Sequence, residues 1–229
     1  MVVLATKCYV SGDARDRTLD SLRSLLDNDL ADLAVEYDVG VREDDFPSVT
    51  LSGEDAPVAR NLLAEHWGTI TSHFETGERY VGTLESWDDE GFVLDAGEPI
   101  RIPTEGIGLG AGSPEQIRTR LGLVQHVPLT FVYESGPDGD VPATGRLADD
   151  QRDRLFDWTR GDGRVNVNSA TRAEVRATVN RAGHAEDIVT VERLGLLEQS
   201  IVCTEGTDPP GLLASIGSYL PAELLAVVP

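Results

Sequence analysis

Apolar residues recur along the chain either at every second position, as in a strand, or with the 3.6-residue period of a helix. The order in which these two patterns follow one another divides the chain into three parts. Over residues 1–76, segments with a two-residue period and segments with a helical period follow the order β-α-β-β-α-β. Every second residue of 33–41 is apolar, which predicts a half-buried strand, and the leucines of 19–30 share one helical face. A first strand is expected at 2–10 and a weaker last strand at 69–74.

Residues 77–147 have a different order of elements. Ser113-Pro-Glu-Gln116 is a capping box with proline at the first helical position, and it predicts the start of a short helix. The order β-β-β-α-β-β is that of an OB-fold barrel, and an SH3-like barrel, which needs no such helix, is the nearest alternative. We place the five extended segments at 79–87, 91–96, 100–109, 127–134 and 143–147.

A charged helix over 149–160 is expected to link this barrel to the last part of the chain. Residues 164–229 then repeat the first order of elements, with a second capping box at Thr171-Arg-Ala-Glu174. In each outer part, two helices can cover one face of a four-stranded antiparallel sheet and leave the other face to a partner or a neighbouring domain. We therefore expect an α+β protein with two ferredoxin-like βαββαβ domains, at 1–76 and 164–229, flanking an OB-like β-barrel at 77–147, with a linking helix at 148–163.

The composition indicates adaptation to high salt. The chain carries 40 acidic and 19 basic residues, a formal net charge of −21, and Lys7 is its single lysine. Carboxylates hold water and hydrated cations, and in molar salt their mutual repulsion is screened over about 3 Å. The negative charge of a halophilic protein therefore does not by itself exclude a nucleic-acid partner. Salt does weaken phosphate contacts steeply, so such a site should depend on stacking and shape.

The cysteines and the apolar runs indicate a cytoplasmic protein. Cys8 and Cys203 each lie in an apolar alternating run, which predicts two buried thiols rather than a disulfide. We see no cleavable signal pattern at the start of the sequence, and no apolar run approaches the roughly 18 residues of a membrane span. A membrane partner is not expected.

The sequence contains no motif for a metal, a cofactor or a catalytic nucleophile. The glycine-rich stretch 106–112 precedes a helix, but it lacks the nucleotide-loop patterns, and glycines at a barrel bend explain it. No Ser, His and Asp arrangement stands out from the sequence. We therefore expect a non-catalytic protein without a cofactor. The four histidines also lack metal-ligand spacing, and they are His66, His73, His126 and His184.

One stretch reverses the acidic trend of the chain. From Arg164 to Arg181 there are four arginines and one glutamate, and Arg172 and Arg176 share a helical face. A local positive patch in so acidic a chain suggests an anionic partner. The alternative is that these arginines pair with the protein's own carboxylates, for example on the linking helix. The nucleic-acid-binding residues expected on this patch are Arg164, Asn166, Asn168, Arg172, Arg176 and Arg181.

The barrel offers a second candidate surface. OB-folds bind oligonucleotides on the face formed by their second and third strands. Tyr80, Phe92 and Arg101 could lie on that face, with Trp87 at the end of the first hairpin. Phe92 or Trp87 would then stack on a base, whereas the alternative is that these aromatic residues belong to the core of the barrel.

Four segments of the chain resemble a known family. They are Val-Thr-Val-Glu-Arg-Leu-Gly-Leu-Leu-Glu at 189–198, Gly-Thr-Asp-Pro-Pro-Gly at 206–211, Gly-Phe-Val-Leu-Asp-Ala-Gly at 91–97 and Ile-Arg-Ile-Pro-Thr at 100–104. In these segments the chain is similar to the archaeal domain-of-unknown-function family 2110, and the resemblance runs over most of the chain. It implies an archaeal cytosolic protein, which together with the acidic composition suggests a halophilic archaeon, and it carries over no activity and no site residues.

Three functional hypotheses follow. The first is a non-catalytic RNA-binding or ribosome-associated protein, supported by the positive patch and by a set of domains that is typical of nucleic-acid binders only by analogy. The second is a protein-interaction scaffold, in which free sheet faces pair with a protein partner or with a second copy of the chain. The third is a small-molecule sensor or enzyme with a cleft between its domains.

Overall fold

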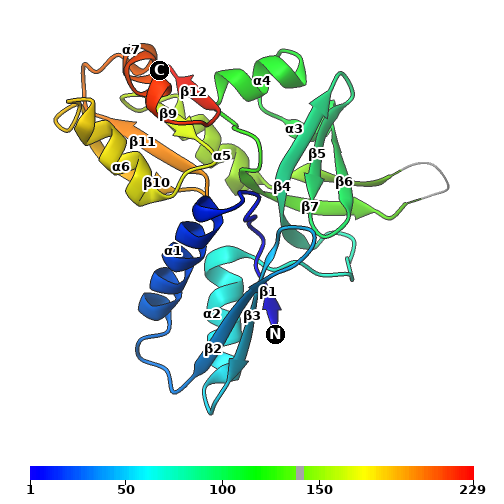
Figure 1. Ribbon diagram of the computed structural model, residues 1–229. Coiled ribbons are helices and arrows are strands. Elements are labelled where there is room, and N and C mark those ends of the chain that lie inside the picture. Colours follow the sequence, from blue (N-terminus) through cyan, green and yellow to red (C-terminus); the bar gives the residue numbers. More distant parts are fainter. Residues whose placement is uncertain (138–141) are drawn as a thin grey trace.

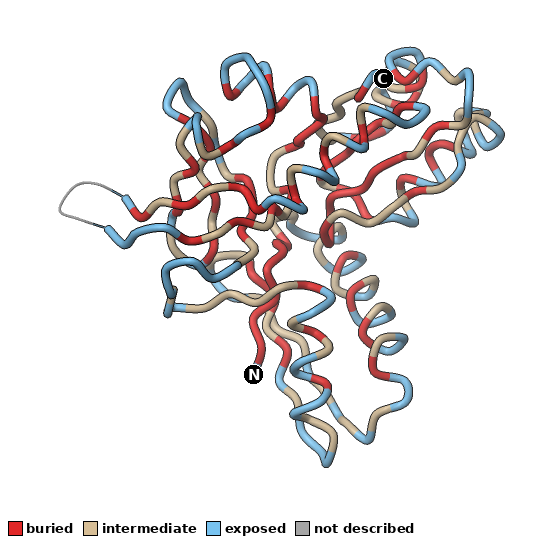
Figure 2. Tube along the Cα trace, turned by 180° about the vertical axis from the view of Figure 1, so that it is seen from behind, coloured by how far each residue is buried: buried red, intermediate tan, exposed pale blue. Residues whose placement is uncertain are grey.

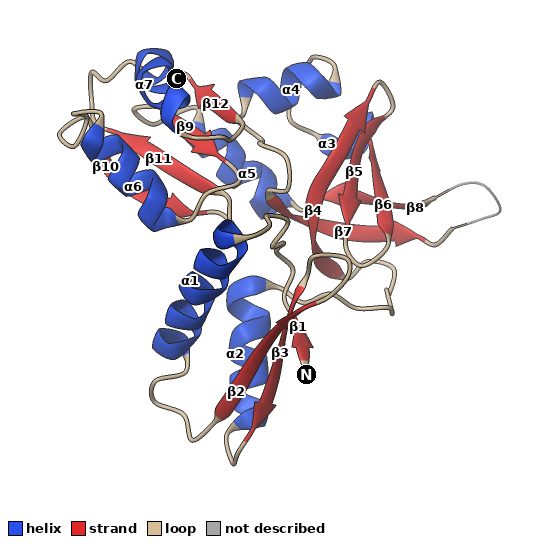
Figure 3. Ribbon diagram, viewed as in Figure 1, coloured by secondary structure: helices blue, strands red, loops and turns tan. Residues whose placement is uncertain are grey.

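The computed structural model describes residues 1–137 and 142–229. An N-terminal unit, a β-barrel and a C-terminal unit meet around a common centre (Figure 1). Helices and strands are mixed in the two outer units, whereas strands dominate the barrel (Figure 3). The fold is therefore α+β, as the sequence predicts, with a closed five-stranded barrel and two separate sheets.

In the N-terminal unit, helices α1 and α2 pack on one face of an antiparallel sheet with the strand order β1-β3-β2. Leu22 and Leu26, on the apolar face of α1, are fully buried in one cluster with Val49 of the sheet. The opposite sheet face is polar, with Asp38 and Thr50 exposed. The elements are β1 (Val2–Val3), α1 (Asp13–Asp29), β2 (Glu36–Val41), β3 (Pro47–Ser52) and α2 (Ala56–Trp67).

The N-terminal sheet has three strands where the sequence predicts four. The segment 69–74 contributes only an isolated bridge between Leu4 and Thr69, and β1 is two residues long. Beyond β1 the chain leaves the sheet, and residues 2–8 are all buried on their way to the centre of the molecule (Figure 2). These residues contact the other two units, and such tertiary contacts override the strand conformation that the local periodicity predicted for 2–10.

The barrel closes in the strand order β4-β5-β6-β8-β7, with β4 paired to β7. Strands β6 and β8 pair in parallel, whereas their neighbours pair antiparallel. Helix α4 begins at the capping box of Ser113 and Gln116, as predicted. The elements are β4 (Arg79–Asp88), β5 (Gly91–Asp95), β6 (Pro99–Pro103), α3 (Thr104–Ile107), α4 (Pro114–Arg120), β7 (Pro128–Ser135) and β8 (Ala143–Leu147).

The prediction of an extended segment at 100–109 is wrong for the second half of that segment. Strand β6 ends at Pro103, and the next four residues form the short helix α3. Gly108 follows this helix in the left-handed conformation, with φ of 65°, a backbone geometry that glycine adopts without steric cost. The glycine-rich stretch therefore ends a helical turn between the third strand and α4.

The C-terminal unit follows the linking helix α5 and forms a four-stranded antiparallel sheet in the order β10-β11-β9-β12. Helices α6 and α7 cover one face, where Val165 and Val167 are buried with Val175 and Ile216. The second capping box, at Thr171 and Glu174, begins α6 as predicted. The elements are α5 (Asp149–Trp158), β9 (Arg164–Val167), α6 (Arg172–Arg181), β10 (Ile188–Arg193), β11 (Gln199–Cys203), α7 (Pro209–Ile216), the 3₁₀ turn η1 (Gly217–Tyr219) and β12 (Leu224–Val227).

The second face of the C-terminal sheet packs against the barrel. Val227 of β12 belongs to the barrel core cluster, together with Leu155 and Trp158 of α5, and Leu225 packs against that cluster. Asn166 of β9 donates a hydrogen bond to the carbonyl oxygen of Gly122 at 2.8 Å. This face is therefore covered over β9 and β12 and is not free for a partner there.

Two predictions from composition can be compared with the structure. Cys8 and Cys203 are both buried and form no disulfide, as the sequence predicts. Within residues 1–137 and 142–229, no helix has both the length and the apolar character that crossing a bilayer requires.

Candidate functional site

A cleft of about 830 Å³ lies between α5 and the β10 edge of the C-terminal sheet. It opens where the barrel stops covering the sheet, and its walls come from the linking helix on one side and from β9, β10 and the start of α6 on the other. Four arginines and one tryptophan carry its chemistry, and they are Arg154, Trp158, Arg164, Arg172 and Arg193.

Arg164 is held against the buried Trp158. Its guanidinium lies 4.9 Å from the centre of the indole ring, and that of Arg154 lies 5.7 Å from the same ring. Arg164 also donates hydrogen bonds to Glu192 at 3.0 Å and to the hydroxyl of Ser200 at 3.1 Å. This arginine therefore already has partners within the protein, as the alternative interpretation of the positive patch expected.

Arg193 has no such carboxylate partner. Its guanidinium lies 3.9 Å from the centre of the Trp67 ring, and its Nη1 atom is buried without a hydrogen-bond partner in the described part of the chain. Burial lowers the pKa of Arg193, and the positive charge of Arg172 lowers it further, while Asp29 acts in the opposite direction. The Arg193 guanidinium is thus under the opposing influence of the Asp29 and Arg172 charges, without a direct ion pair among the described residues.

The carboxylates of the cleft do not neutralise these arginines. Asp150 pairs with Arg79 outside the cleft at 2.5 Å, Asp157 pairs with Arg160 at 3.0 Å, and Glu192 pairs with Arg164. Among the described residues, the cleft therefore presents one unpaired carboxylate, Asp153, and three unpaired guanidinium groups. These three belong to Arg154, Arg172 and Arg193.

The structure separates the residues predicted for the positive patch. Arg164 and Arg172 line the cleft, whereas Arg181 lines a smaller hollow between α1 and α6, and Arg176 is exposed outside both. Asn166 and Asn168 are buried and donate hydrogen bonds to backbone carbonyl groups of the barrel unit. Neither asparagine can contact a nucleic acid in this conformation, because its side chain is enclosed between the two units.

The aromatic residues predicted on the barrel do not form a stacking surface. Phe92 is fully buried inside the barrel, which corrects its expected place on the outer face. Trp87 is half-buried and covered by the guanidinium of Arg118 at 3.8 Å. The remaining two residues are engaged elsewhere, Tyr80 in an aromatic cluster with Phe74 and Tyr133, and Arg101 in an ion pair with Asp88 at 2.7 Å.

The sequence analysis missed two of the three unpaired arginines of the cleft, Arg154 and Arg193. Arg154 and Trp158 stand in the linking helix, where a charged helix with a few apolar residues looks like an ordinary surface element. Arg193 stands in the segment 189–198, which carries the family resemblance. A lone arginine among the apolar residues at the end of a strand was the available signal, but its contact with Trp67 depends on the tertiary structure.

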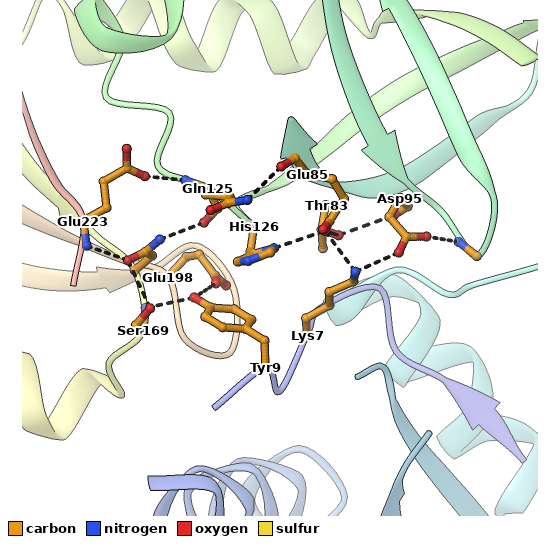
Figure 4. Close-up of polar contacts among 12 residues, drawn as sticks. Lys7, Tyr9, Thr83, Glu85, Asp95, Gln125, His126, Ser169, Glu198 and Glu223 are labelled. Atoms are coloured by element: carbon orange, nitrogen blue, oxygen red, sulfur yellow. Dashed lines mark hydrogen bonds and ion pairs between the residues drawn. The ribbon is translucent and has the colours of Figure 1, made fainter. Parts of the chain in front are cut away.

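The three units are joined beside the cleft at a polar junction around Tyr9 (Figure 4). The Tyr9 hydroxyl donates a hydrogen bond to Glu198 at 2.8 Å and accepts one from the backbone N–H of Ser169 at 2.9 Å. The Tyr9 ring lies 4.1 Å from the ring of His126, which contacts Glu85 at 3.1 Å. One tyrosine of the N-terminal unit thus contacts both other units.

Lys7 extends this junction into the barrel. Its ammonium group lies 3.0 Å from Glu85 and 2.7 Å from Asp95 (Figure 4). Although burial raises it, hydrogen bonds from His126 and Lys7 lower the pKa of Glu85 to about 2. The single lysine of the chain is therefore used to pair two carboxylates of the barrel with the N-terminal unit.

The pKa of a second carboxyl group of the junction, that of Glu198, is shifted in the opposite direction. Glu198 is fully buried, and burial raises its pKa to about 8. His126 and Ser169 have positive φ angles of 67° and 56°, which residues with a side chain rarely adopt. Such backbone strain persists only where the surrounding contacts impose it. The junction therefore joins the three units through buried polar contacts.

Comparison with known proteins assigns the chain to a family. No curated protein matches it. Three family models do, namely the DUF2110 N-terminal domain over residues 1–73, the DUF2110 central domain over 74–159 and the DUF2110 C-terminal domain over 162–228. Together they span nearly the whole sequence, and the chain therefore belongs to the DUF2110 family.

Proposed function

We propose that this protein binds RNA, free or within a particle such as the ribosome, through the cleft between α5 and β10. One observation carries the proposal: Arg154, Arg172 and Arg193 converge on one cleft without carboxylate partners among the described residues. The chain holds 40 acidic residues against 19 basic ones, so a partner for each arginine would be easy to supply. Leaving three guanidinium groups unpaired in one place favours an anionic ligand from outside.

Electrostatics supports a phosphate ligand. Burial and the like charge of Arg172 disfavour the charged form of Arg193, Asp29 offsets them only in part, and a bound anion would stabilise the charged form further. A guanidinium presents several N–H donors in one plane, which match the oxygens of a phosphate group. Because a partly buried pair is screened less than a surface pair, Arg193 can keep such a contact in molar salt.

The size of the cleft favours single-stranded RNA over an RNA duplex as its ligand. Its volume of about 830 Å³ is that of a small-ligand pocket, which admits a few nucleotides of a flexible strand. RNA is most often recognised in single-stranded segments, through phosphate contacts combined with stacking on aromatic or guanidinium planes. The planes of Arg154 and Arg164 beside Trp158 could provide that stacking.

We also propose that the barrel is OB-like and that the outer units are ferredoxin-like. Parallel pairing of the third and fifth strands, with helices between the third and fourth, supports the first assignment. The order β10-β11-β9-β12, with α6 and α7 on one face, supports the second for the C-terminal unit. Both arrangements recur among nucleic-acid binders, which adds only an analogy to the case.

The experiment is a fluorescence-anisotropy titration of a labelled, mixed-sequence single-stranded RNA in molar KCl. Arg154→Gln, Arg172→Gln and Arg193→Gln should each weaken binding by about tenfold and lower the slope of log affinity against log salt by about 1. Arg60→Gln on α2 and Arg176→Gln on α6 are the matched controls, because both residues are exposed and lie outside the cleft. RNA binding that is absent in the wild type, or equal in cleft and control variants, would overturn the proposal.

A further inference from the structure

A second constellation lies on the helix-covered side of the C-terminal sheet, away from the cleft. The hydroxyl of Ser215 on α7 lies 2.7 Å from Nε2 of His184. Nδ1 of the same histidine lies 2.6 Å from Oδ2 of Asp187. A serine on Nε2 and a carboxylate on Nδ1 is the connectivity by which an imidazole activates a serine nucleophile.

Local structure holds the histidine and the aspartate in place. Gly183, with φ of 85°, ends α6, and the N–H of His184 bonds back to the carbonyl of Val179. The turn continues to Asp187, whose N–H bonds to the carbonyl of His184. The carbonyl of Asp187 in turn accepts hydrogen bonds from the N–H of Thr204 and from the hydroxyl of Thr207. The two side chains are therefore oriented by backbone contacts and not only by each other.

A pocket of about 300 Å³ adjoins these residues. His184 and Asp187 line it together with the loop residues Gly206 to Asp208 and the first turn of α7. Gly211 lines the pocket and shares a helical face with Ser215, because the two are four residues apart on α7. Ser215 is itself only partly buried. A small substrate in the pocket would therefore contact His184, whose Nε2 atom lies 2.7 Å from the serine hydroxyl.

We propose that Ser215 is a nucleophile for acyl transfer, with His184 as its general base and Asp187 as the residue that orients the imidazole. The Ser215 Oγ forms a bond to the acyl carbon of an ester while its proton passes to Nε2 of His184. The carbon–oxygen bond to the alcohol breaks, and the alcohol leaves with that proton. Water then attacks the acyl-serine, again losing a proton to His184, and the carboxylic acid departs as the proton returns to Ser215.

The lining of the pocket narrows the class of substrate. Asp187 and Asp208 both contribute carboxylates to its wall, and neither has an arginine partner among the described residues. An anionic acyl group would meet this negative wall, whereas a small neutral or amine-bearing ester would not. The site would give this chain a chemical activity, although its sequence motifs predict none.

The test uses the full chain in molar KCl and a tagged fluorophosphonate, whose phosphorus–fluorine bond breaks as a serine oxygen attacks. The label should appear on the peptide that contains Ser215 and be absent from Ser215→Ala. His184→Gln should slow labelling by about 100-fold or more, because the general base is removed. Ser218→Ala is the matched control, since Ser218 is exposed nearby and should leave labelling unchanged. Hydrolysis of p-nitrophenyl acetate should follow the same order of variants.

The pH dependence of labelling separates catalysis from a structural role. The wild-type rate should rise to a plateau as pH increases, because only the neutral imidazole can accept the proton. Asp187→Asn should lower the plateau while retaining the fold, checked by its thermal unfolding midpoint. Labelling of the native wild type that is no faster than that of Ser215→Ala, or than that of heat-unfolded protein, would overturn the proposal.

Discussion

The junction around Tyr9 and the cleft around Arg193 differ in whether their positively charged side chains have carboxylate partners. At the junction, Lys7 lies within 3.0 Å of two carboxylates, and the contacts tie three units together. In the cleft, Arg154, Arg172 and Arg193 have no carboxylate partner in the described part of the chain. The same acidic sequence thus pairs its lysine with carboxylates at the junction and leaves three arginines of one cleft without a carboxylate partner among the described residues. That contrast is what distinguishes a structural contact from a candidate binding site here.

The strongest way to break this contrast is to remove the cation of the junction. Lys7→Ala would leave Glu85 and Asp95 without the ammonium group that lies between them, and the lysine side chain is only 9% exposed. We expect a loss of about 3 kcal/mol in the free energy of unfolding, the lower end for a broken buried pair because both carboxylates are about a quarter exposed. Urea unfolding in molar KCl measures it, and a loss no greater than that of Arg60→Ala would show that the junction is not rigid.

The second prediction concerns pH, and its sign follows from the two carboxyl groups of the junction. Glu198 has its folded-state pKa raised from 4.5 to about 8, so its contribution is fully present below pH 4.5 and is lost as pH rises through 8. Glu85 has its pKa lowered from 4.5 to about 2, so its contribution is present above pH 4.5 and is lost as pH falls toward 2. Their combined contribution should therefore be greatest near pH 4.5.

Glu198→Gln removes the contribution of Glu198, which accounts for the loss of stability above pH 4.5. The amide keeps the shape of the carboxyl group but cannot lose a proton. Between pH 6 and pH 9 the wild type should lose about 3 kcal/mol of stability that the variant retains, measured by urea unfolding at a series of pH values. Parallel stability curves for the two proteins over this range would show that Glu198 does not titrate as its burial requires.

The smallest expected effect is that of an arginine of the cleft on the free energy of unfolding. Arg172 is exposed and repels Arg193, so its removal relieves a like-charge contact. Arg172→Gln should leave the free energy of unfolding unchanged or raise it by less than about 0.5 kcal/mol, while weakening RNA binding. A destabilisation comparable to that of Lys7→Ala would mean that the arginines of the cleft serve the fold, and the distinction between the two regions would fail.

Local signals in the sequence predicted the elements that depend on neighbouring residues. The capping boxes at Ser113 and Thr171 begin helices because their partners are three residues away. Alternation of apolar residues also identified the five strands of the barrel, whose closure buries Phe92 and Phe131. The segment 69–74 failed as a strand because its periodicity was weak and contacts between units decided its path.

The candidate sites depend on contacts that the sequence does not encode locally. Arg193 packs on Trp67, which belongs to the N-terminal unit. Tyr9 donates a hydrogen bond to Glu198, which lies 189 residues further along the sequence. Ser215 and His184 are brought together only when α7 packs beside the end of α6. The run of arginines from Arg164 to Arg181 includes two residues that line the cleft, but only the tertiary structure shows that Arg164 is paired, that Arg172 is unpaired and that Arg176 lies outside.

Ultraviolet crosslinking of RNA to the protein in native high-salt lysate tests the central claim most directly. Wild type and Arg60→Gln should both recover RNA, with crosslinked peptides from α5 or β10, and Arg193→Glu should recover little or none. Absence of RNA from the wild type, or crosslinks that map away from the cleft and persist in Arg193→Glu, would contradict the account.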